Sequence, residues 1–394
     1  MSIIFFDPAD SRKTLLPLTY TRPISEIRIG ILKISEKWCA HLDITHFGYD
    51  TEEYLSNAFP KINADTQTLW INATVLPTND LVEAIQALGS HEALIQKGLV
   101  LAFKGESQEA IINKKSFEGE IHAIRYPWDI FLQNGREIVS DYAFVTSNRS
   151  SYPLNDPHTK TYGEDIFIEE GTSIKAAILN AENGPIYIGK NAEVQEGSII
   201  RGPFALCEGG SLRMGCKIRG DSTIGPYSKV GGEVSNSVIF GNSNKAHDGY
   251  LGNSVIGEWC NLGAGTNNSN LKNNYEPVKM WDYQSHQFEP TGLQFCGLIM
   301  GDHTKTGIGS MFNTGTTVGV SANIFGSGFP RQIIPSFSWG GARGFITYEF
   351  QKAVDTIKKA MGRRNIDMKE EEIEILKHVF DNTSEIRNWQ KQHK

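Results

Sequence analysis

Residues 244–252 (NKAHDGYLG) gather side chains whose types and spacing could do chemistry. His247 follows Lys245 by two residues and precedes Tyr250 by three. An imidazole changes its protonation near neutral pH, so it can take a proton from an attacking group. An ammonium beside it can pair with the phosphate of a substrate. We therefore interpret this stretch as a candidate catalytic site with His247 as its general base.

The chain around this stretch repeats every six residues. After a shift of two residues at 230 the period continues through Val238, Tyr250, Ile256 and Leu262, with Asn244 as its one polar member. The strict members are Ile188, Val194, Ile200, Leu206, Leu212, Ile218, Ile224 and Val230, and the period returns at Met300, Thr306, Phe312, Val318 and Ile324. A short fixed period is typical of a solenoid, whose stacked repeats bury one face of each repeat. We predict a parallel β-helix with three hexads in each triangular coil and with His247 outside its inward positions.

One further segment interrupts the predicted β-helix, and another follows it. Residues 266–291 are polar and lack the period, which is typical of a loop that is functional or disordered. Residues 348–361 and 370–380 have helical amphipathic patterns and are expected to cap the open coil, since an uncapped solenoid end favours aggregation.

Residues 1–150 are predicted to form an α/β domain. Apolar strands are expected at Ile3–Phe6, 68–71 and 99–103, and helices at 27–38 and 80–88. This alternation favours a mainly parallel sheet covered by helices. The predicted domains are therefore 1–150, a linker at 151–165, the β-helix at 166–346 and terminal helices at 347–394.

Composition narrows the classes of function. The 394 residues carry a net charge of -7 and no basic block interleaved with aromatic residues, which argues against a nucleic-acid partner. No apolar stretch approaches the roughly 18 residues of a membrane span, so a cytoplasmic protein without a membrane partner is expected. The five cysteines are scattered without a C-x-x-C pair, and we expect them to be reduced packing residues.

The candidate site resembles a known acyltransferase domain. Residues 245–252 (KAHDGYLG), Ile256-Gly257, 261–266 (NLGAGT) and Asn270 resemble the acyltransferase half of the bifunctional UDP-N-acetylglucosamine pyrophosphorylase / glucosamine-1-phosphate N-acetyltransferase family. The resemblance implies a left-handed β-helix, a homotrimer and acetyl-CoA bound between subunits. It also implies His247 as the base, with Tyr250, Asn261 and Asn270 as contacts of the sugar phosphate.

Other residues of the resemblance concern the thioester and the phosphates. Ala264 and Gly265 would let the thioester approach the backbone, whose N–H groups can stabilise an oxyanion. Lys245, Lys305, Arg331 and Arg343 are candidates to pair with phosphates of the sugar or of coenzyme A. The family has an arginine and a lysine in the coils before the histidine, where this chain has Lys229 and Gly231-Gly232-Glu233. The acceptor sugar therefore stays open.

The N-terminal domain resembles sugar-phosphate nucleotidyltransferases through residues 16–23 (LPLTYTRP) and 126–129 (YPWD). It lacks the glycine-rich loop, which 6–12 (FDPADSR) replaces, as well as the lysine after Pro23 and an acid after the strand near 70. One hypothesis is that Arg12, Arg22 and Arg28 bind the phosphates of a nucleoside triphosphate while Asp7 or Asp10 holds Mg²⁺. The alternative is a decayed site that binds nucleotides or is only structural.

The sequence thus predicts an acetyl-CoA-dependent N-acetyltransferase that acts on a hexosamine 1-phosphate, with nucleotidyl transfer as a second activity. One alternative is a sugar-1-phosphate nucleotidyltransferase whose β-helix serves only assembly. The other is a non-catalytic trimeric scaffold that binds sugar nucleotides.

Overall fold

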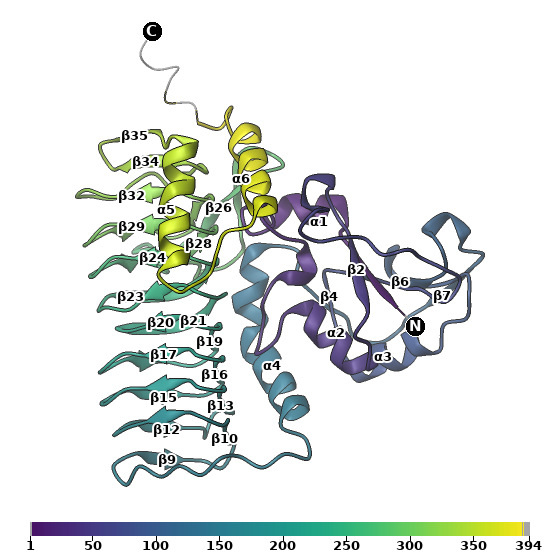
Figure 1. Ribbon diagram of the computed structural model, residues 1–394, viewed down its shortest axis with the longest axis horizontal. Helices are drawn as coiled ribbons and strands as arrows, with labels where there is room; N and C mark the ends of the chain where they lie inside the picture. Colours follow the sequence, from purple (N-terminus) through teal and green to yellow (C-terminus); the bar gives the residue numbers. More distant parts are fainter. Residues whose placement is uncertain (1, 388, 390–394) are drawn as a thin grey trace. The chain divides into compact units, whose positions relative to one another are not determined.

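The computed structural model describes residues 2–387 and 389. The chain packs as two compact units, Met1–Ile27 with Leu32–Asp129 and Arg28–Ile31 with Ile130–Lys394. The predicted fold class is confirmed, because an α/β unit is followed by a parallel β-helix with terminal helices (Figure 1). The predicted domain boundaries stay predictions. Within the described residues, the helices are too short or too polar to cross a membrane.

The first unit is built on a six-stranded mixed sheet. Its order is β2-β1-β3-β6-β5-β7. The strands are β1 (Ile3–Phe6), β2 (Phe47–Asp50), β3 (Leu69–Asn72), β5 (Glu92–Gln96), β6 (Leu99–Lys104) and β7 (Asn113–Ser116), with a separate pair of β4 (Val75–Leu76) and β8 (His122–Ala123). β1 runs parallel to β2 and β3, whereas β6 is antiparallel to both β3 and β5. The predicted strands are therefore present, but the sheet is less parallel than the sequence suggested.

One helix of this unit begins later than the sequence pattern predicted. The helices are α1 (Ala9–Thr14), α2 (Ile34–Leu42) and α3 (Asn79–Gln86). The prediction of a helix at 27–38 is wrong in its first half. Ile27 has extended backbone angles, and residues 22–31 are buried without a break, so the apolar residues here do not mark one face of a helix. α3 begins as expected, because the Thr78 hydroxyl accepts a hydrogen bond from the Leu81 N–H at 3.3 Å.

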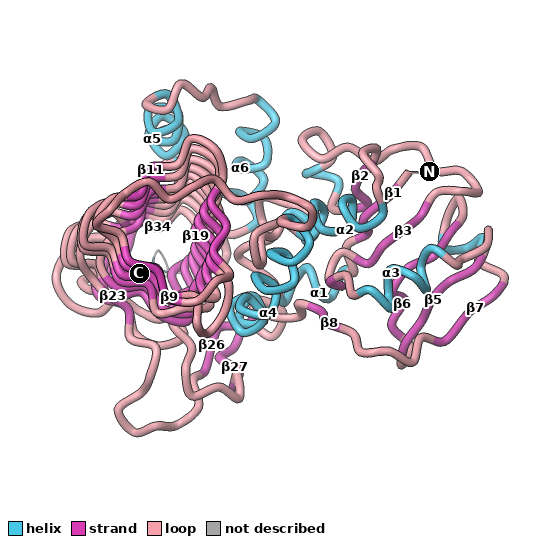
Figure 2. The backbone as a smooth tube through the Cα atoms, turned by 90° about the horizontal axis from the view of Figure 1, so that it is seen from below, coloured by secondary structure: helices cyan, strands magenta, loops and turns pink. Residues whose placement is uncertain are grey.

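The β-helix has three faces, which Figure 2 shows nearly along the axis of the coils. Face 1 contains β10 (Ile166–Ile168), β13 (Ile186–Ile188), β16 (Phe204–Leu206), β19 (Ser222–Ile224), the ends of β21 (Glu233–Ile239) and β23 (Tyr250–Ile256), β28 (Leu298–Met300), β31 (Thr316–Val318) and β33 (Ile333–Ile334). Face 2 contains β11 (Ser173–Ile174), β14 (Glu193–Val194), β17 (Ser211–Leu212), β20 (Lys229–Val230), β22 (Asn244–Lys245), β24 (Asn261–Leu262), β29 (Lys305–Thr306), β32 (Asn323–Ile324) and β34 (Ser338–Gly341).

Face 3 begins inside the segment predicted as a linker. It contains β9 (Lys160–Tyr162), β12 (Ile178–Asn180), β15 (Ile199–Arg201), β18 (Lys217–Ile218) and the starts of β21 and β23, after which β25 (Asn267–Asn268) pairs with β30 (Met311–Phe312). β9 pairs in parallel with β12, so the coil already includes Lys160.

The eight predicted inward residues from Ile188 to Val230 are confirmed, since each is at most 2% exposed. The phase predicted after the shift is wrong by one residue as far as Tyr250 and is confirmed again at Ile256 and Leu262, which are 1% and 3% exposed. Ile239, Lys245 and Leu251 continue the inward rows, in register with Ile224, Val230 and Val234. Asn236 in β21 and Asn253 in β23 each turn the strand from face 3 to face 1 in a single left-handed residue, with φ 44° and 49°, so each bend shortens its coil by one residue.

The predicted break from 266 to 291 is not wholly irregular. It contains an antiparallel hairpin of β26 (Lys279–Asp282) and β27 (Gln287–Pro290). The rings of Trp281 and Phe288 lie 5.4 Å apart across this hairpin. The period then returns as predicted, with Met300, Phe312 and Val318 fully buried.

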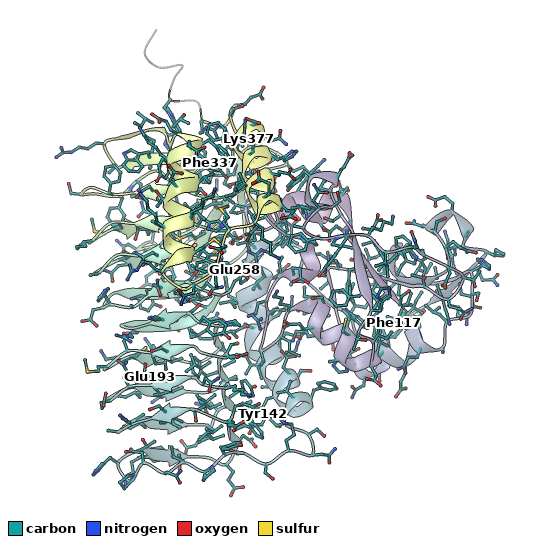
Figure 3. All side chains as sticks on the ribbon, viewed as in Figure 1. Phe117, Tyr142, Glu193, Glu258, Phe337 and Lys377 are labelled. Carbon is teal, nitrogen blue, oxygen red and sulfur yellow. The ribbon has the colours of Figure 1, made fainter. Side chains whose placement is uncertain are left out.

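The two terminal helices are α5 (Phe350–Gly362) and α6 (Glu370–Asn382), and they lie alongside the coils (Figures 1 and 3). Phe337 contacts the rings of Phe350 and Phe380 at 6.0 and 5.0 Å. Beyond the other end of α5, Arg364 donates to Asn244 Oδ1 at 3.1 Å. A helix of this length spans roughly 20 Å, or about four strand spacings. The prediction that these helices cap the coil is therefore wrong.

Other groups accompany the ends and sides of the β-helix. Phe345 of β35 (Gly344–Thr347) and Trp389 belong to the same apolar core, and their rings lie 6.1 Å apart.

α4 (Pro127–Val145), which the sequence analysis missed, packs on face 1. Buried Asn134 of α4 donates to the Asp221 carbonyl at 2.9 Å and accepts from the Thr223 hydroxyl at 3.1 Å.

Candidate active site

His247 lies in the corner 246–249, between β22 on face 2 and β23 on face 3. Its side chain is exposed, as the sequence predicted for a residue outside the inward rows. The corner of the next coil, 263–266, stacks directly on it, because the Gly265 N–H donates to the Asp248 carbonyl at 2.9 Å. The structure therefore brings His247, Ala264 and Gly265 to the same corner of adjacent coils.

Tyr250 and Asn270 are in direct contact. Asn270 Nδ2 donates to the Tyr250 hydroxyl at 3.0 Å and to Asn253 Oδ1 at 2.7 Å. The Tyr250 N–H donates to Asn267 Oδ1 at 2.7 Å. Burial raises the pKa of Tyr250, so its hydroxyl keeps its proton and can donate it to a ligand oxygen. Two residues that are 20 apart in sequence thus form one polar unit.

A charged pair beside Tyr250 was missed in the sequence analysis. Glu233 is the register partner of Tyr250 in the neighbouring coil. Arg219 Nη1 lies 3.2 Å from Glu233 Oε1. The signal was available, since Arg219 directly follows the inward Ile218, but the irregular spacing through β21 hid which residues lie beside Tyr250. The exposed pair adds little stability, so Arg219 is available to an anionic ligand.

Lys245 does not lie on the surface beside His247. It is 2% exposed and stands in the inward row, in register with Val230. Its ammonium donates to the carbonyls of Gly231 at 3.0 Å and His247 at 2.7 Å. Burial lowers the pKa of Lys245 to about 8. The side chain predicted to touch a substrate is thus directed into the coil.

The other predicted cofactor contacts are not gathered in one place. Lys305 is half-buried on face 2, and its ammonium donates to the His303 carbonyl at 3.3 Å. Burial also lowers the pKa of Lys305. Arg331 is exposed just before β33, and Arg343 is exposed in the turn between β34 and β35. Within the described residues, Lys305, Arg331 and Arg343 share no hydrogen-bond or ion-pair partner.

Asn261 and the predicted oxyanion donors have well-defined partners. Asn261 is exposed on face 2, where its Oδ1 accepts from Asn244 Nδ2 at 3.4 Å. The Gly265 N–H already donates to Asp248, whereas the Ala264 N–H has no backbone acceptor in the described part of the chain. Of the two backbone donors, Ala264 is therefore the one that can turn toward a developing oxyanion.

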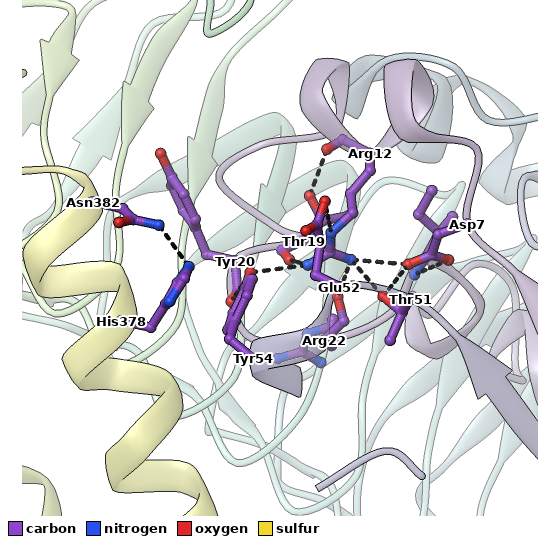
Figure 4. Close-up of polar contacts among 11 residues, drawn as sticks. Asp7, Arg12, Thr19, Tyr20, Arg22, Thr51, Glu52, Tyr54, His378 and Asn382 are labelled. Atoms are coloured by element: carbon purple, nitrogen blue, oxygen red, sulfur yellow. Dashed lines mark hydrogen bonds and ion pairs between the residues drawn. The ribbon is translucent and has the colours of Figure 1, made fainter. Parts of the chain in front are cut away.

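In the N-terminal unit, Arg12 is buried in a network of internal acceptors (Figure 4). Its Nη1 donates to Asp7 Oδ2 at 2.9 Å and to the Arg22 carbonyl at 3.1 Å. Its Nη2 donates to the Tyr54 hydroxyl at 3.0 Å and to the Thr19 carbonyl. These contacts tie α1 to Asp7, to the segment 19–22 and to Tyr54.

The carboxylate of Asp7 does not fit a magnesium site. One oxygen accepts from Arg12 at 2.9 Å and from Thr51 at 2.6 Å, and the other accepts from the Ile24 N–H at 3.0 Å. Burial raises the pKa of Asp7 despite the neighbouring guanidinium. Among the described residues no three His, Cys, Asp or Glu side chains converge as metal ligands.

The remaining two predicted phosphate contacts are also buried. Arg22 is 6% exposed, and its carbonyl accepts from Arg12. Arg28 is 6% exposed and lies in the short segment that packs within the second unit, where its guanidinium contacts the Ile31 carbonyl and, at 4.0 Å, Cys207 Sγ. The five cysteines are free thiols, as expected from their spacing.

The N-terminal part of the chain matches a model of known proteins described as sugar nucleotidyl transferase. Residues 3–150 match this family. The resemblance stated from the sequence is thereby confirmed. Among the relatives of the chain are proteins named as bifunctional.

Three such relatives illustrate the likeness. The bifunctional protein GlmU of Methanocaldococcus jannaschii is 41% identical over 87 residues, 22% of this chain and 21% of the relative. That of Methanococcus aeolicus is 31% identical over 32% of this chain and 26% of its own length. The bifunctional sugar-1-phosphate nucleotidylyltransferase/acetyltransferase of Sulfurisphaera tokodaii is 31% identical over 36% and 35%. The chain thus matches about a third or less of each relative's length.

Solved structures resemble this chain only weakly. The polySia-specific acetyltransferase NeuO is 16% identical with a TM-score of 0.26, covering 50% of this chain and 86% of that one. The Arabidopsis UDP-N-acetylglucosamine acyltransferase is 12% identical with a TM-score of 0.26, covering 54% and 77%.

Proposed function

We propose that the β-helix transfers an acetyl group from acetyl-CoA to the amine of a hexosamine 1-phosphate. The observation that carries this proposal is the exposed His247 at the corner it shares with Ala264, three residues before the Tyr250–Asn270 pair. A base, a backbone donor and a polar pair that can hold a sugar thus occur on neighbouring coils. The name of the Sulfurisphaera tokodaii relative, which joins sugar-1-phosphate nucleotidyl transfer and acetyl transfer in one protein, supports it.

The reaction that these residues can perform is amide formation. Bound acetyl-CoA supplies the activated acetyl group. His247 accepts a proton from the acceptor amine while the nitrogen attacks the thioester carbonyl carbon. The C–N bond forms, the C–S bond breaks, and the imidazolium returns the proton to the departing sulfur. The Ala264 N–H donates to the carbonyl oxygen as negative charge develops on it.

The acceptor is held by groups on face 3. The Tyr250 hydroxyl and the Asn270 amide offer donors and acceptors to sugar hydroxyl groups. Arg219 lies two coils before Tyr250, with Glu233 between them, and is well suited to a phosphate because a guanidinium binds oxyanions in a bidentate way. A cytoplasmic homotrimer remains part of this proposal.

A second candidate function rests on the family match of residues 3–150. Sugar-1-phosphate nucleotidyl transfer would be seen as pyrophosphate release from UTP and a hexosamine 1-phosphate. The internal engagement of Arg12 and Asp7 argues against the phosphate and metal roles first considered for them. If pyrophosphate is released while acetyl transfer is absent, the β-helix serves assembly only.

The direct test is a thiol-release assay with acetyl-CoA and a panel of amino-sugar phosphates. A reaction without acceptor corrects for the protein's own five thiols. We expect release that depends on the amino sugar and stops when the amine is already acetylated. Release at the background rate with every acceptor would overturn the acetyltransferase proposal.

Tyr250→Phe removes the hydroxyl but keeps the ring. We expect the KM for the acceptor to rise about tenfold, the effect of one lost hydrogen bond, with little change in the KM for acetyl-CoA. Tyr227→Phe serves as the control, because it removes a hydroxyl of the same kind that donates to Glu208 Oε1 at 3.0 Å, outside the proposed acceptor site. An unchanged acceptor KM in Tyr250→Phe would remove Tyr250 from the site.

A further inference from the structure

The corners between faces 2 and 3 follow one rule away from His247. Four corners of four residues each place a left-handed glycine third, namely Gly197, Gly215, Gly265 and Gly309. Each of these glycines donates its N–H to a carbonyl in the corner of the preceding coil, at 2.7 to 2.9 Å. This backbone bond ties each corner to the one before it.

The corner of His247 departs from this rule. Its third residue is Asp248, and the preceding corner has only two residues, Gly231 and Gly232, between β20 and β21. The two missing residues are one cause of the shift in the sequence period. In the described chain no backbone N–H from 246 to 249 donates to that shortened corner. The His247 corner thus lacks the bond that its neighbours have.

The Lys245 side chain connects the His247 corner to the shortened corner before it. Its ammonium bridges the carbonyl of Gly231, in the shortened corner, and the carbonyl of His247 itself. An aliphatic residue fills the register position on either side, Val230 before it and Leu262 after it. Burying a cation in this apolar row costs free energy unless hydrogen bonds compensate for the lost hydration.

Resting on the proposed function, we infer that Lys245 is a positioning residue that fixes the backbone of His247 from inside the β-helix. It acts through hydrogen bonds to carbonyl groups and does not touch the substrate. Two backbone amides report on the fixed corner, because Glu233 donates to the Gly249 carbonyl at 3.1 Å and Gly265 donates to the Asp248 carbonyl at 2.9 Å.

The test is hydrogen exchange of Lys245→Met, which keeps the length of the side chain and removes its donors. We expect faster exchange at Glu233 and Gly265 and unchanged exchange at Gly215 and Gly309. Thiol release should show a kcat lower by about ten- to a hundredfold, as for a misplaced catalytic group, and a KM for acetyl-CoA within about twofold. Leu212→Met, in the same inward row, is the control and should change neither.

Three outcomes would overturn the inference. Unchanged exchange at Glu233 and Gly265 would show that the ammonium does not fix the corner. Faster exchange with an unchanged kcat would show that fixing the corner does not matter for catalysis, as would a change in KM alone. The exchange result does not depend on activity, so it decides the structural part even if the protein transfers no acetyl group. Lys245→Gln, which keeps one donor, replaces the first variant if that variant does not fold, with a smaller change in the same direction.

Discussion

His247→Gln is expected to lower kcat for acetyl transfer by about 10²- to 10⁴-fold, the contribution of a well-placed general base. Glutamine keeps a polar side chain of similar size but cannot accept a proton at neutral pH. Because His247 is exposed in a corner, the substitution should leave the fold and the melting temperature unchanged. The KM for acetyl-CoA should also stay near its wild-type value, since the imidazole acts in the transition state.

The measurement is thiol release at saturating acetyl-CoA and acceptor. His158→Gln is the matched control, because His158 is likewise exposed in a turn but lies far from the His247 corner in the coil order. The control should keep the wild-type kcat. A wild-type kcat in His247→Gln would contradict the assignment of the base. Pyrophosphate release by either variant, measured in parallel, would show whether the N-terminal unit acts independently.

The repeat could be predicted from the sequence, but its register beyond the shift could not. Six-residue spacing requires only that each face contributes one inward side chain, and the aliphatic row from Ile188 to Val230 satisfies it. The shift has three causes that act together, the shortened corner at Gly231-Gly232 and the one-residue bends at Asn236 and Asn253. Counting in sixes cannot separate them, so it placed Asn244 inside and Lys245 outside.

The sequence predicted those parts of the candidate site whose residues are close in sequence or lie one coil apart. His247 and Tyr250 are neighbours on one turn, and their spacing to 263–265 matches one coil of the solenoid. Arg219 and Glu233 reach Tyr250 through strand pairing across the irregular β21, which no local pattern reveals. In the N-terminal unit, the charge of Arg12 suggested phosphate binding, but charge alone does not tell an exposed guanidinium from one that fills a buried network.

A second large effect is expected in the pH dependence of folding. Lys245 has a pKa of about 8 in the folded protein, lowered by burial from about 10.5. Below pH 8 the folded state must hold a buried charge, so it is destabilised relative to the unfolded chain. As the pH rises from 8 to 10.5, the unfolded chain binds more protons and this destabilisation is lost. Relative to Lys245→Met, the wild-type protein should therefore gain about 3 kcal/mol of unfolding free energy between roughly pH 7 and 10.5.

The measurement is urea unfolding of both proteins across this pH range, read as a difference. Cys216 lies near Lys245, and burial raises its pKa to about 12, so it also changes stability with pH. Because Lys245 and Cys216 shift each other's pKa, both proteins are compared in a Cys216→Ala background, so that the difference reports the lysine. A difference that is flat with pH would mean that the ammonium reaches water, and the His247 carbonyl would then have lost its internal donor. A rising difference together with a slower Lys245→Met enzyme would mean that this coil gives up stability to hold its histidine in place.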